Sequence, residues 1–200
     1  MISETKPDQA LLKELRNQAE SLHAHEPAYQ RAAWLDTLLM LIVAVLVALS
    51  INQFVFQIIR VEGPSMQPTF WTGERVFTEK ISYTFREPRR KEVVVARYFP
   101  DSDQVIKRVI GLPGDTIEIR NGVIYINDDI LDESAYWHDI ISYYNEMPPV
   151  VIPEKHVFLI GDNRNNSYDS REVGPVPYNQ IVGHVAFRIW PLNRIGRFPQ

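Results

Sequence analysis

A serine and a lysine in this chain could together perform nucleophilic catalysis. Ser65 lies in the stretch Val61-Glu-Gly-Pro-Ser-Met-Gln-Pro, with Gly63 and Pro64 before it and Pro68 after it. Proline fixes φ and glycine permits tight turns, so we expect a stiff, exposed turn that holds the hydroxyl against a substrate carbonyl. Taken alone, the same pattern also fits an ordinary turn.

Lys107 is the candidate for the base that would activate such a serine. It lies in Gln104-Val-Ile-Lys-Arg-Val-Ile-Gly, where strand alternation places it on one face with Val105 and Val109. Burial among valines disfavours the charged amine and lowers its pKa. A neutral amine within hydrogen-bond reach of a serine can accept its proton, and Ser–Lys pairs are a known variant of serine catalysis. The alternative is an edge-strand lysine whose amine reaches water.

Other chemistries have less support. The chain has no cysteine, which excludes disulfides, thiolate zinc sites and a cysteine nucleophile. Its five histidines lie outside any metalloprotease or hydrolase motif. The run Asp162-Asn-Arg-Asn-Asn differs from a calcium loop, because Arg164 occupies a ligand position and no glycine stands at the sixth place. We therefore expect no metal and no cofactor. A net charge of −4 gives no reason to expect nucleic acid as a partner.

The segment after about residue 57 must position these two side chains, and it is typical of a β domain. Short β-branched stretches alternate with turn residues, and further strands are expected at 92–99, 157–161 and 183–190. Asn121-Gly122 supplies the positive φ values of a type I′ turn. The resulting hairpin is expected to pair Arg120 with Val123, Ile119 with Ile124, and Ile117 with Ile126. We predict a mainly β, antiparallel-sheet domain over 57–200, with a small excursion or β subdomain at about 127–153.

An apolar stretch precedes this domain. Thr37–Ile51 carries no charge, and the count from Trp34 to Phe56 gives about the 20 residues that a helix needs to cross a bilayer. We predict a retained transmembrane anchor at 34–56 after a polar tail at 1–33. The alternatives are a cleavable signal peptide, with small residues at Ala48 and Ser50, and a buried core helix. Basic residues in the tail weakly favour a cytoplasmic N-terminus.

Several stretches, taken in chain order, resemble the motifs of bacterial type I signal peptidases of the single-anchor form. They are Ser65-Met-Gln-Pro-Thr, Gly73-Glu-Arg-Val with Glu79-Lys80, Lys107-Arg-Val-Ile-Gly-Leu-Pro-Gly-Asp, Gly161-Asp-Asn-Arg-Asn-Asn-Ser-Tyr-Asp-Ser-Arg and Phe187-Arg-Ile-Trp-Pro-Leu-Asn-Arg-Ile-Gly. The resemblance extends from the apolar stretch to nearly the last residue.

The resemblance implies a membrane-bound serine endopeptidase that removes N-terminal signal peptides from exported preproteins. Cleavage would follow small residues at −1 and −3 and proceed through an acyl-enzyme. Ser65 would be the nucleophile and Lys107 the base. Ser167 would orient the lysine amine. Asp169 and Arg171 would form a structural pair that holds this last motif near the two catalytic residues.

The resemblance also suggests which residues meet the substrate. Val61, Met66 and Ile106 are the candidates for lining the substrate site. The implied partners are signal peptides and membrane lipid, with no requirement for an oligomer. The implied location is a single-pass membrane protein whose catalytic domain lies outside the cytoplasm.

Two positions depart from the family pattern. Gly63 stands where some members have a serine that donates to the oxyanion, which leaves the second donor open. Asn165 stands where many members have Asp, and we expect little effect there. Three rival hypotheses are a self-cleaving repressor of the LexA kind, a membrane-anchored module that has lost activity, and a peptidase dedicated to one substrate. The first would need a DNA-binding helical domain in place of the apolar stretch.

Overall fold

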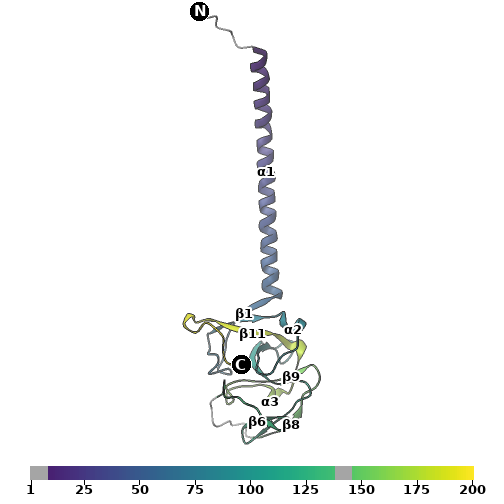
Figure 1. Cartoon of the computed structure of the whole chain (residues 1–200), viewed down its shortest axis with the longest axis vertical. Coiled ribbons are helices and arrows are strands. Elements are labelled where there is room, and N and C mark those ends of the chain that lie inside the picture. Colours follow the sequence, from purple (N-terminus) through teal and green to yellow (C-terminus); the bar gives the residue numbers. More distant parts are fainter. Residues whose placement is uncertain (1–8, 138–145) are drawn as a thin grey trace, which may run out of the picture. The chain divides into compact units, whose positions relative to one another are not determined.

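A computed structural model describes residues 9–137 and 146–200, apart from the side chains of 19, 21–33 and 51–54 (Figure 1). The chain divides into two units, Met1–Ser50 and Ile51–Gln200. The first element is helix α1 (Gln9–Phe54), which extends beyond the predicted anchor at 34–56 into the tail. The second unit contains β1 (Phe56–Arg60), β2 (Arg75–Glu79), α2 (Ser82–Phe85), β3 (Val93–Ala96), β4 (Val105–Gly111), β5 (Thr116–Arg120), β6 (Val123–Ile126), β7 (Asp129–Ile130), β8 (Met147–Val151), β9 (His156–Ile160), α3 (Ser170–Val173), β10 (Val176–Pro177), η1 (Tyr178–Gln180), β11 (Ile181–Trp190) and η2 (Leu192–Arg194).

Helix α1 carries the apolar stretch identified in the sequence. Its large apolar side chains between Trp34 and Leu49 are all exposed, by 46–76%. Among the residues that the structure describes, no helix is both long enough and apolar enough to cross a membrane.

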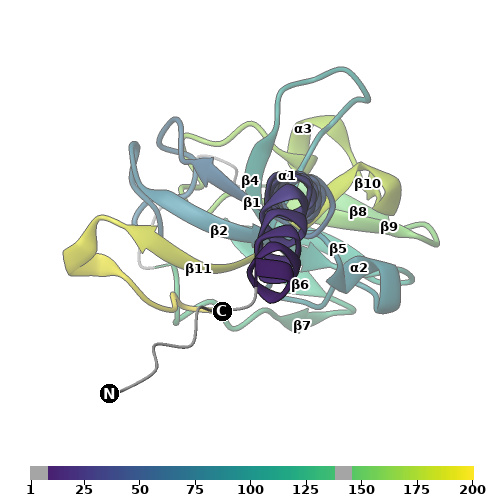
Figure 2. The ribbon, with the colours of Figure 1, turned by 90° about the horizontal axis from the view of Figure 1, so that it is seen from above.

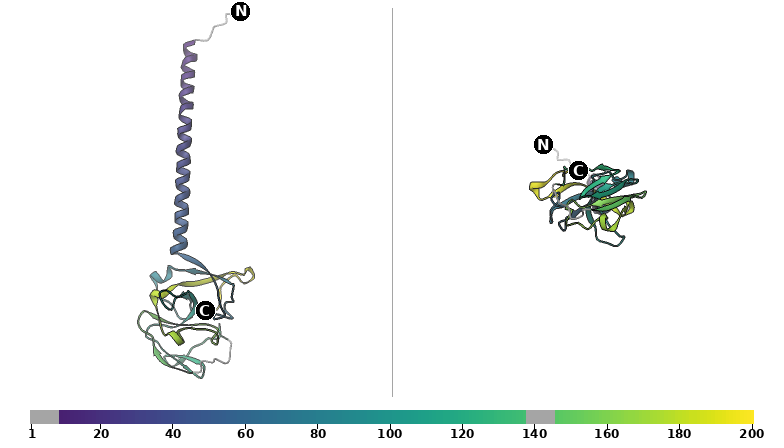
Figure 3. Two further views of the ribbon diagram at one scale, coloured as in Figure 1. Left: turned by 180° about the vertical axis from the view of Figure 1, so that it is seen from behind. Right: turned by 90° about the horizontal axis from the view of Figure 1, so that it is seen from below.

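Strands of the second unit form two antiparallel sheets in the described part of the chain. The larger has the order β1-β2-β11-β3-β4-β9-β10, and the smaller has the order β7-β6-β5-β8. Strands β1 and β11 lie at one end of this unit and β6 and β8 at the other (Figure 1). The view from below shows the strands of the unit in projection (Figure 3, right). The predicted mainly β, antiparallel architecture is confirmed.

The smaller sheet begins with the predicted hairpin. Its register pairs Arg120 with Val123, Ile119 with Ile124 and Ile117 with Ile126, as expected. Asn121 and Gly122 have φ values of 50° and 78°, which the type I′ turn requires. Strands β7 and β8 of the predicted excursion at 127–153 pair with this hairpin, while its residues 138–145 lie outside the described ones.

The central strands β3 and β4 are buried on both faces, which explains their β-branched sequences. Val93 and Val95 pack into one apolar cluster, whereas Val94 and Ala96 pack into another. The short, fully buried β3 is the centre of the predicted strand at 92–99. Strand β4 is therefore held between β3 and β9 with little freedom to move, and it is the strand that carries Lys107.

Candidate active site

Ser65 lies in a tight turn that follows β1. Gly63 adopts a φ of 78°, a conformation that favours glycine. The N–H of Gln67 donates to the Pro64 carbonyl at 3.0 Å, and the Thr72 hydroxyl donates to the Gly63 carbonyl at 3.0 Å. These bonds hold the turn on both sides of Ser65, which is itself half-buried. The stiff turn expected from the sequence is thus present, with the serine reachable from solvent.

Lys107 lies in the middle of β4, opposite Val94 of β3. Only 3% of the residue is exposed. Burial is the main cause that lowers the pKa of Lys107 from its ordinary 10.5 to about 8, and the negative charge of Asp169 opposes this fall. The interpretation of Lys107 as a desolvated lysine is supported, since its strand is central and not at an edge. A substantial fraction of this amine is neutral near pH 8.

Ser65 and Lys107 line one cavity of about 540 Å³. The cavity lies along β1, the edge strand of the larger sheet, and reaches the start of β4. Its other lining residues are Gln57, Ile59, Arg60, Glu62, Asp103, Gln104, Val105 and Ile106. No hydrogen bond joins the Ser65 hydroxyl to the Lys107 amine among the described contacts. Catalytic hydrogen bonds often tighten only when substrate is bound.

The segment 161–171 packs directly against the serine turn. The Asn163 N–H donates to the Ser65 carbonyl at 3.0 Å, and the Asn163 side-chain amide donates to the Pro64 carbonyl at 3.2 Å. Gly161 leaves no room for a side chain: an added Cβ would lie 2.2 Å from the Ser167 hydroxyl oxygen and 2.5 Å from the Ser65 carbonyl oxygen. This close approach brings Ser167 beside the backbone of Ser65.

Asp169 organises the same segment as the N-cap of α3. Its carboxylate accepts hydrogen bonds from the Gly161 N–H at 3.0 Å and from the Ser167 hydroxyl at 2.7 Å. It also accepts two bonds from the Arg171 guanidinium, at 2.8 and 2.9 Å, in an ion pair that is at most 1% exposed. Asp169 and Arg171 therefore form the buried pair that the sequence led us to expect. Their position fixes Ser167 and places a negative charge near Lys107.

A second buried carboxylate, Asp162, joins the two candidate catalytic segments. It accepts from Arg108, the residue after Lys107, at 2.8 and 2.6 Å. It also accepts from the Thr69 hydroxyl at 2.5 Å, four residues beyond Ser65. One side chain thus holds β4 and the end of the serine turn together.

The chain that contains this half-buried serine, desolvated lysine and carboxylate-braced segment is similar to known proteins. A family model for "Signal peptidase, peptidase S26" matches residues 34–190. The chain belongs to this family. It is accordingly a serine endopeptidase of the type I signal peptidase kind, and the resemblance found in the sequence is confirmed.

Relatives with the same description match most of the chain. A probable signal peptidase I-2 from Synechocystis is 39% identical over 171 residues, covering 82% of this chain and 76% of the relative. A signal peptidase I from Bacillus caldolyticus is 37% identical over 163 residues, covering 76% and 89%. Thylakoidal processing peptidase 1 from Arabidopsis thaliana is 38% identical, but this chain spans only 42% of its length. A crystal structure of a signal peptidase I from Enterococcus faecalis matches with a TM-score of 0.45 and 28% identity, covering 50% of this chain and 98% of that one.

The three predicted substrate-site residues divide between the cavity and the core. Ile106 lines the cavity of this S26 peptidase beside Lys107. Val61 and Met66 are 2% and 1% exposed and lie in the core cluster that also contains Ile106. Neither lines the cavity, whereas Ile59 of β1 packs against this cluster and does line it.

Sequence reasoning missed the residues that connect distant segments. Asp162 and Arg108 stand within the sequence motifs, but the sequence assigned neither a partner nor a role to them. Glu133 was not singled out, although it pairs with Arg164 in the interior. A charged residue within a β-branched run is a local signal for a buried ion pair, but the sequence does not name its partner.

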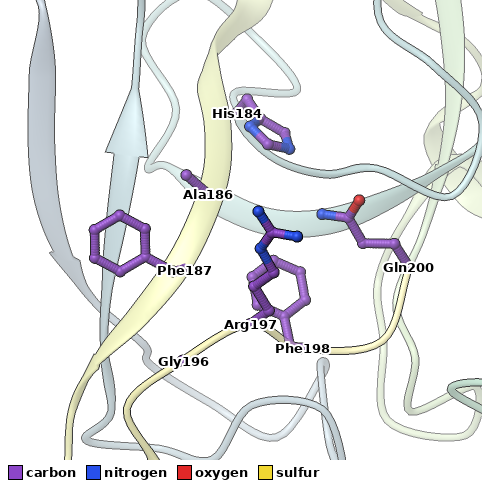
Figure 4. A pocket seen from close by; sticks show the side chains of 7 residues that line it. All are labelled: His184, Ala186, Phe187, Gly196, Arg197, Phe198 and Gln200. Atoms are coloured by element: carbon purple, nitrogen blue, oxygen red, sulfur yellow. The ribbon is translucent and has the colours of Figure 1, made fainter.

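A larger cavity of about 720 Å³ lies elsewhere, between β11 and the chain segment after η2 (Figure 4). Arg197, Gln200 and His184 gather on one side of β11, while the Phe187 ring points to the other side (Figure 4). Neither Ser65 nor Lys107 lines this cavity. The smaller cavity is therefore the candidate active site, because both groups line it.

Proposed function

We propose that this peptidase removes N-terminal signal peptides from exported preproteins, with Ser65 as nucleophile and Lys107 as general base. The observation that carries the proposal is the shared cavity, in which the serine and the desolvated lysine are both lining residues. Membership of the signal peptidase family gives the reaction class.

The neutral Lys107 amine accepts the Ser65 hydroxyl proton as the serine oxygen attacks the scissile carbonyl. The tetrahedral intermediate collapses when the protonated lysine gives its proton to the departing amine of the mature protein. This leaves the signal peptide esterified to Ser65. Water then attacks the ester as Lys107 accepts its proton. The second tetrahedral intermediate collapses when the protonated lysine returns that proton to the departing Ser65 oxygen, which releases the signal peptide with a free carboxylate.

Ser167 can hold the lysine in the orientation that this reaction needs. Because its hydroxyl donates to Asp169, its oxygen lone pairs remain available to accept an N–H of the Lys107 amine. The lone pair of a neutral amine held in this way can face Ser65. The oxyanion would accept a hydrogen bond from the Ser65 N–H. Gly63 has no side chain that could donate a second one.

The substrate is expected to bind as an extended chain along β1. Strand β1 is at the edge of its sheet, so one side of its backbone is free to pair with an added strand. Ile59 and Ile106 supply apolar walls beside the catalytic pair. Small side chains at −1 and −3 would fit against these walls, since every second residue of an extended chain faces the same side.

We further propose that residues 34–56 anchor the enzyme in the membrane, with the N-terminus in the cytoplasm and the catalytic domain outside. The exposed apolar side chains of α1 support this proposal. A second apolar surface lies on the outer face of β1, β2 and β11, where Ile58, Phe77 and Phe187 are neighbours in register. The rings of Phe77 and Phe187 stack at 4.8 Å, and Ile58 is 54% exposed. Of the aromatics near the serine turn, Trp71 is 48% exposed while Phe70 is fully buried.

The decisive experiment is cleavage of a labelled preprotein by the full chain in lipid-containing detergent micelles. The variants are Ser65→Ala and Lys107→Ala, with Ser134→Ala and Lys13→Ala as matched exposed controls. We expect the wild type and both controls to cut after an Ala-x-Ala site, and both site variants to be inactive. Substantial cleavage by Lys107→Ala would show that another group is the base. A wild type that is inert on several preproteins but cuts one would favour a dedicated substrate.

A further inference from the structure

Two arginines of the candidate active site are held by one short turn of the smaller-sheet region. The turn spans 133–137, and hydrogen bonds from Tyr136 N–H and Trp137 N–H to the Glu133 carbonyl close it at 3.1 and 2.9 Å. Its residues come between β7 and the segment 138–145, so they belong neither to β4 nor to the segment 161–171. Glu133 and Tyr136 are nevertheless buried, with 7% and 1% of each residue exposed.

The turn contacts Arg164 of the segment 161–171 and Arg108 of β4. Glu133 forms a buried ion pair with both terminal nitrogens of Arg164, which lies in the segment 161–171. The Tyr136 ring lies 3.9 Å from the guanidinium carbon of Arg108, the neighbour of Lys107 in β4. The guanidinium carbon of Arg164 lies 5.1 Å from the centre of the Trp137 ring.

Arg164 also binds the backbone of Gly161, where the segment 161–171 packs against the serine turn. Its Nε donates to the Gly161 carbonyl at 3.2 Å. Gly161 is the residue at which an added Cβ would meet both the Ser167 hydroxyl oxygen and the Ser65 carbonyl oxygen. A shift of Gly161 would therefore disturb Ser167 and the serine turn, because there is no room for a side chain between them and both Gly161 and Ser167 donate to Asp169.

We propose that Glu133 is a positioning residue for catalysis, which acts through Arg164 to hold Gly161, and with it Ser167 and the Ser65 turn, in the reactive arrangement. This inference rests on the proposed roles of Ser65 and Lys107. The turn 133–137, which follows β7 of the smaller sheet, would then link β4 to the segment 161–171 from outside the cavity. Glu133 does not line the cavity.

The test compares Glu133→Gln with the double variant Glu133→Leu/Arg164→Met. The single variant leaves a buried arginine without its carboxylate, so it is expected to lower both Tm and kcat. The double variant removes both charges and fills the space with apolar atoms, which can restore stability to a buried pair site. It still lacks the hydrogen bond to Gly161. Asp128→Asn, an exposed carboxylate-to-amide change in the same sheet region, is the matched control.

We expect the double variant to recover a Tm close to that of the wild type while its kcat stays roughly tenfold to a hundredfold low, since a misplacement of about 1 Å can cost about a hundredfold. Its KM should change little, because the cavity walls are intact. If kcat returns together with Tm, Glu133 has only a structural role and the inference is overturned. Full activity of folded Glu133→Gln would also overturn it, whereas the proposed function fails only if Ser65→Ala or Lys107→Ala retains activity.

Discussion

Arg108 and Asp162 form a buried ion pair with two hydrogen bonds, at 2.8 and 2.6 Å, in which neither side chain is more than 1% exposed. Arg108 directly follows Lys107, and Asp162 directly precedes the asparagine that binds the Ser65 carbonyl. The pair therefore sets the distance between the strand of the proposed base and the turn of the proposed nucleophile. Thr69 adds a third hydrogen bond to the same carboxylate.

Replacing Asp162 by asparagine should strongly destabilise the fold. The change leaves the buried Arg108 guanidinium without a counter-charge, and breaking a buried pair from one side costs about 3–5 kcal/mol. Urea denaturation of the full chain in detergent measures the loss, with the exposed Asp101→Asn as control. A loss below about 1 kcal/mol would mean that water or another group compensates the arginine.

The rate of cleavage should rise with pH through the pKa of Lys107. The proposed base works only as the neutral amine, and burial lowers its pKa to about 8. We expect kcat/KM to increase about tenfold per pH unit well below pH 8 and to level off above it. Initial rates on a preprotein between pH 6 and 10 give the profile. A rate that is flat from pH 6 to 8 would contradict a lysine base with this pKa.

Lys107 should cost stability wherever it must be charged inside the fold. Its folded pKa of about 8 lies below its ordinary value of 10.5, a difference equivalent to about 3 kcal/mol. The penalty is absent above pH 10.5, grows as pH falls towards 8 and is complete below that. Lys107→Met should therefore raise the free energy of unfolding at pH 6 by up to about 3 kcal/mol, with a smaller gain at pH 10. Equal gains at both pH values would show that packing, and not charge, is responsible.

Gly161→Ala should abolish cleavage by displacing Ser167 from the serine turn. The new methyl group would lie 2.2 Å from the Ser167 hydroxyl oxygen and 2.5 Å from the Ser65 carbonyl oxygen, distances at which backbone must move. We expect kcat to fall by about a hundredfold or more. The exposed Asn166→Ala in the same segment serves as control and should keep full activity. A fully active Gly161→Ala would mean that this contact does not hold the reactive geometry.

Local features of the fold could be predicted from the sequence, because their causes are local. Asn121-Gly122 sets the turn and the register of its hairpin, and the valines around Lys107 indicate its burial. The partners of buried charges could not be predicted in this way. Asp162 and Arg108 are 54 residues apart, and only the folding of the larger sheet brings them together.

The assignment of Val61 to the substrate site shows the same limit. Its closeness in sequence to Ser65 suggested a lining residue, but only 2% of Val61 is exposed. Val61 lies in a core cluster, and the β1 residues that line the cavity are Gln57, Ile59 and Arg60. Which residues near Ser65 line the cavity depends on how β1, the serine turn and β4 pack together, and closeness in sequence does not determine that packing.

The apolar outer face of β1, β2 and β11 should contribute to activity at a membrane. Seen from above, β1, β2 and β11 run side by side (Figure 2), as their register also requires. Ile58 and Trp190 on this face are 54% and 48% exposed, so their replacement should leave the core intact.

An apolar side chain withdrawn from lipid loses roughly 1–2 kcal/mol. We therefore expect Ile58→Ser/Trp190→Ser to cleave a vesicle-inserted preprotein at least about fivefold more slowly, and a short soluble peptide at the normal rate. Phe85→Ser removes an even more exposed aromatic from α2 and serves as control. Equal losses on both substrates would place these two residues in substrate binding, and no loss on either would mean that this face does not contact the membrane.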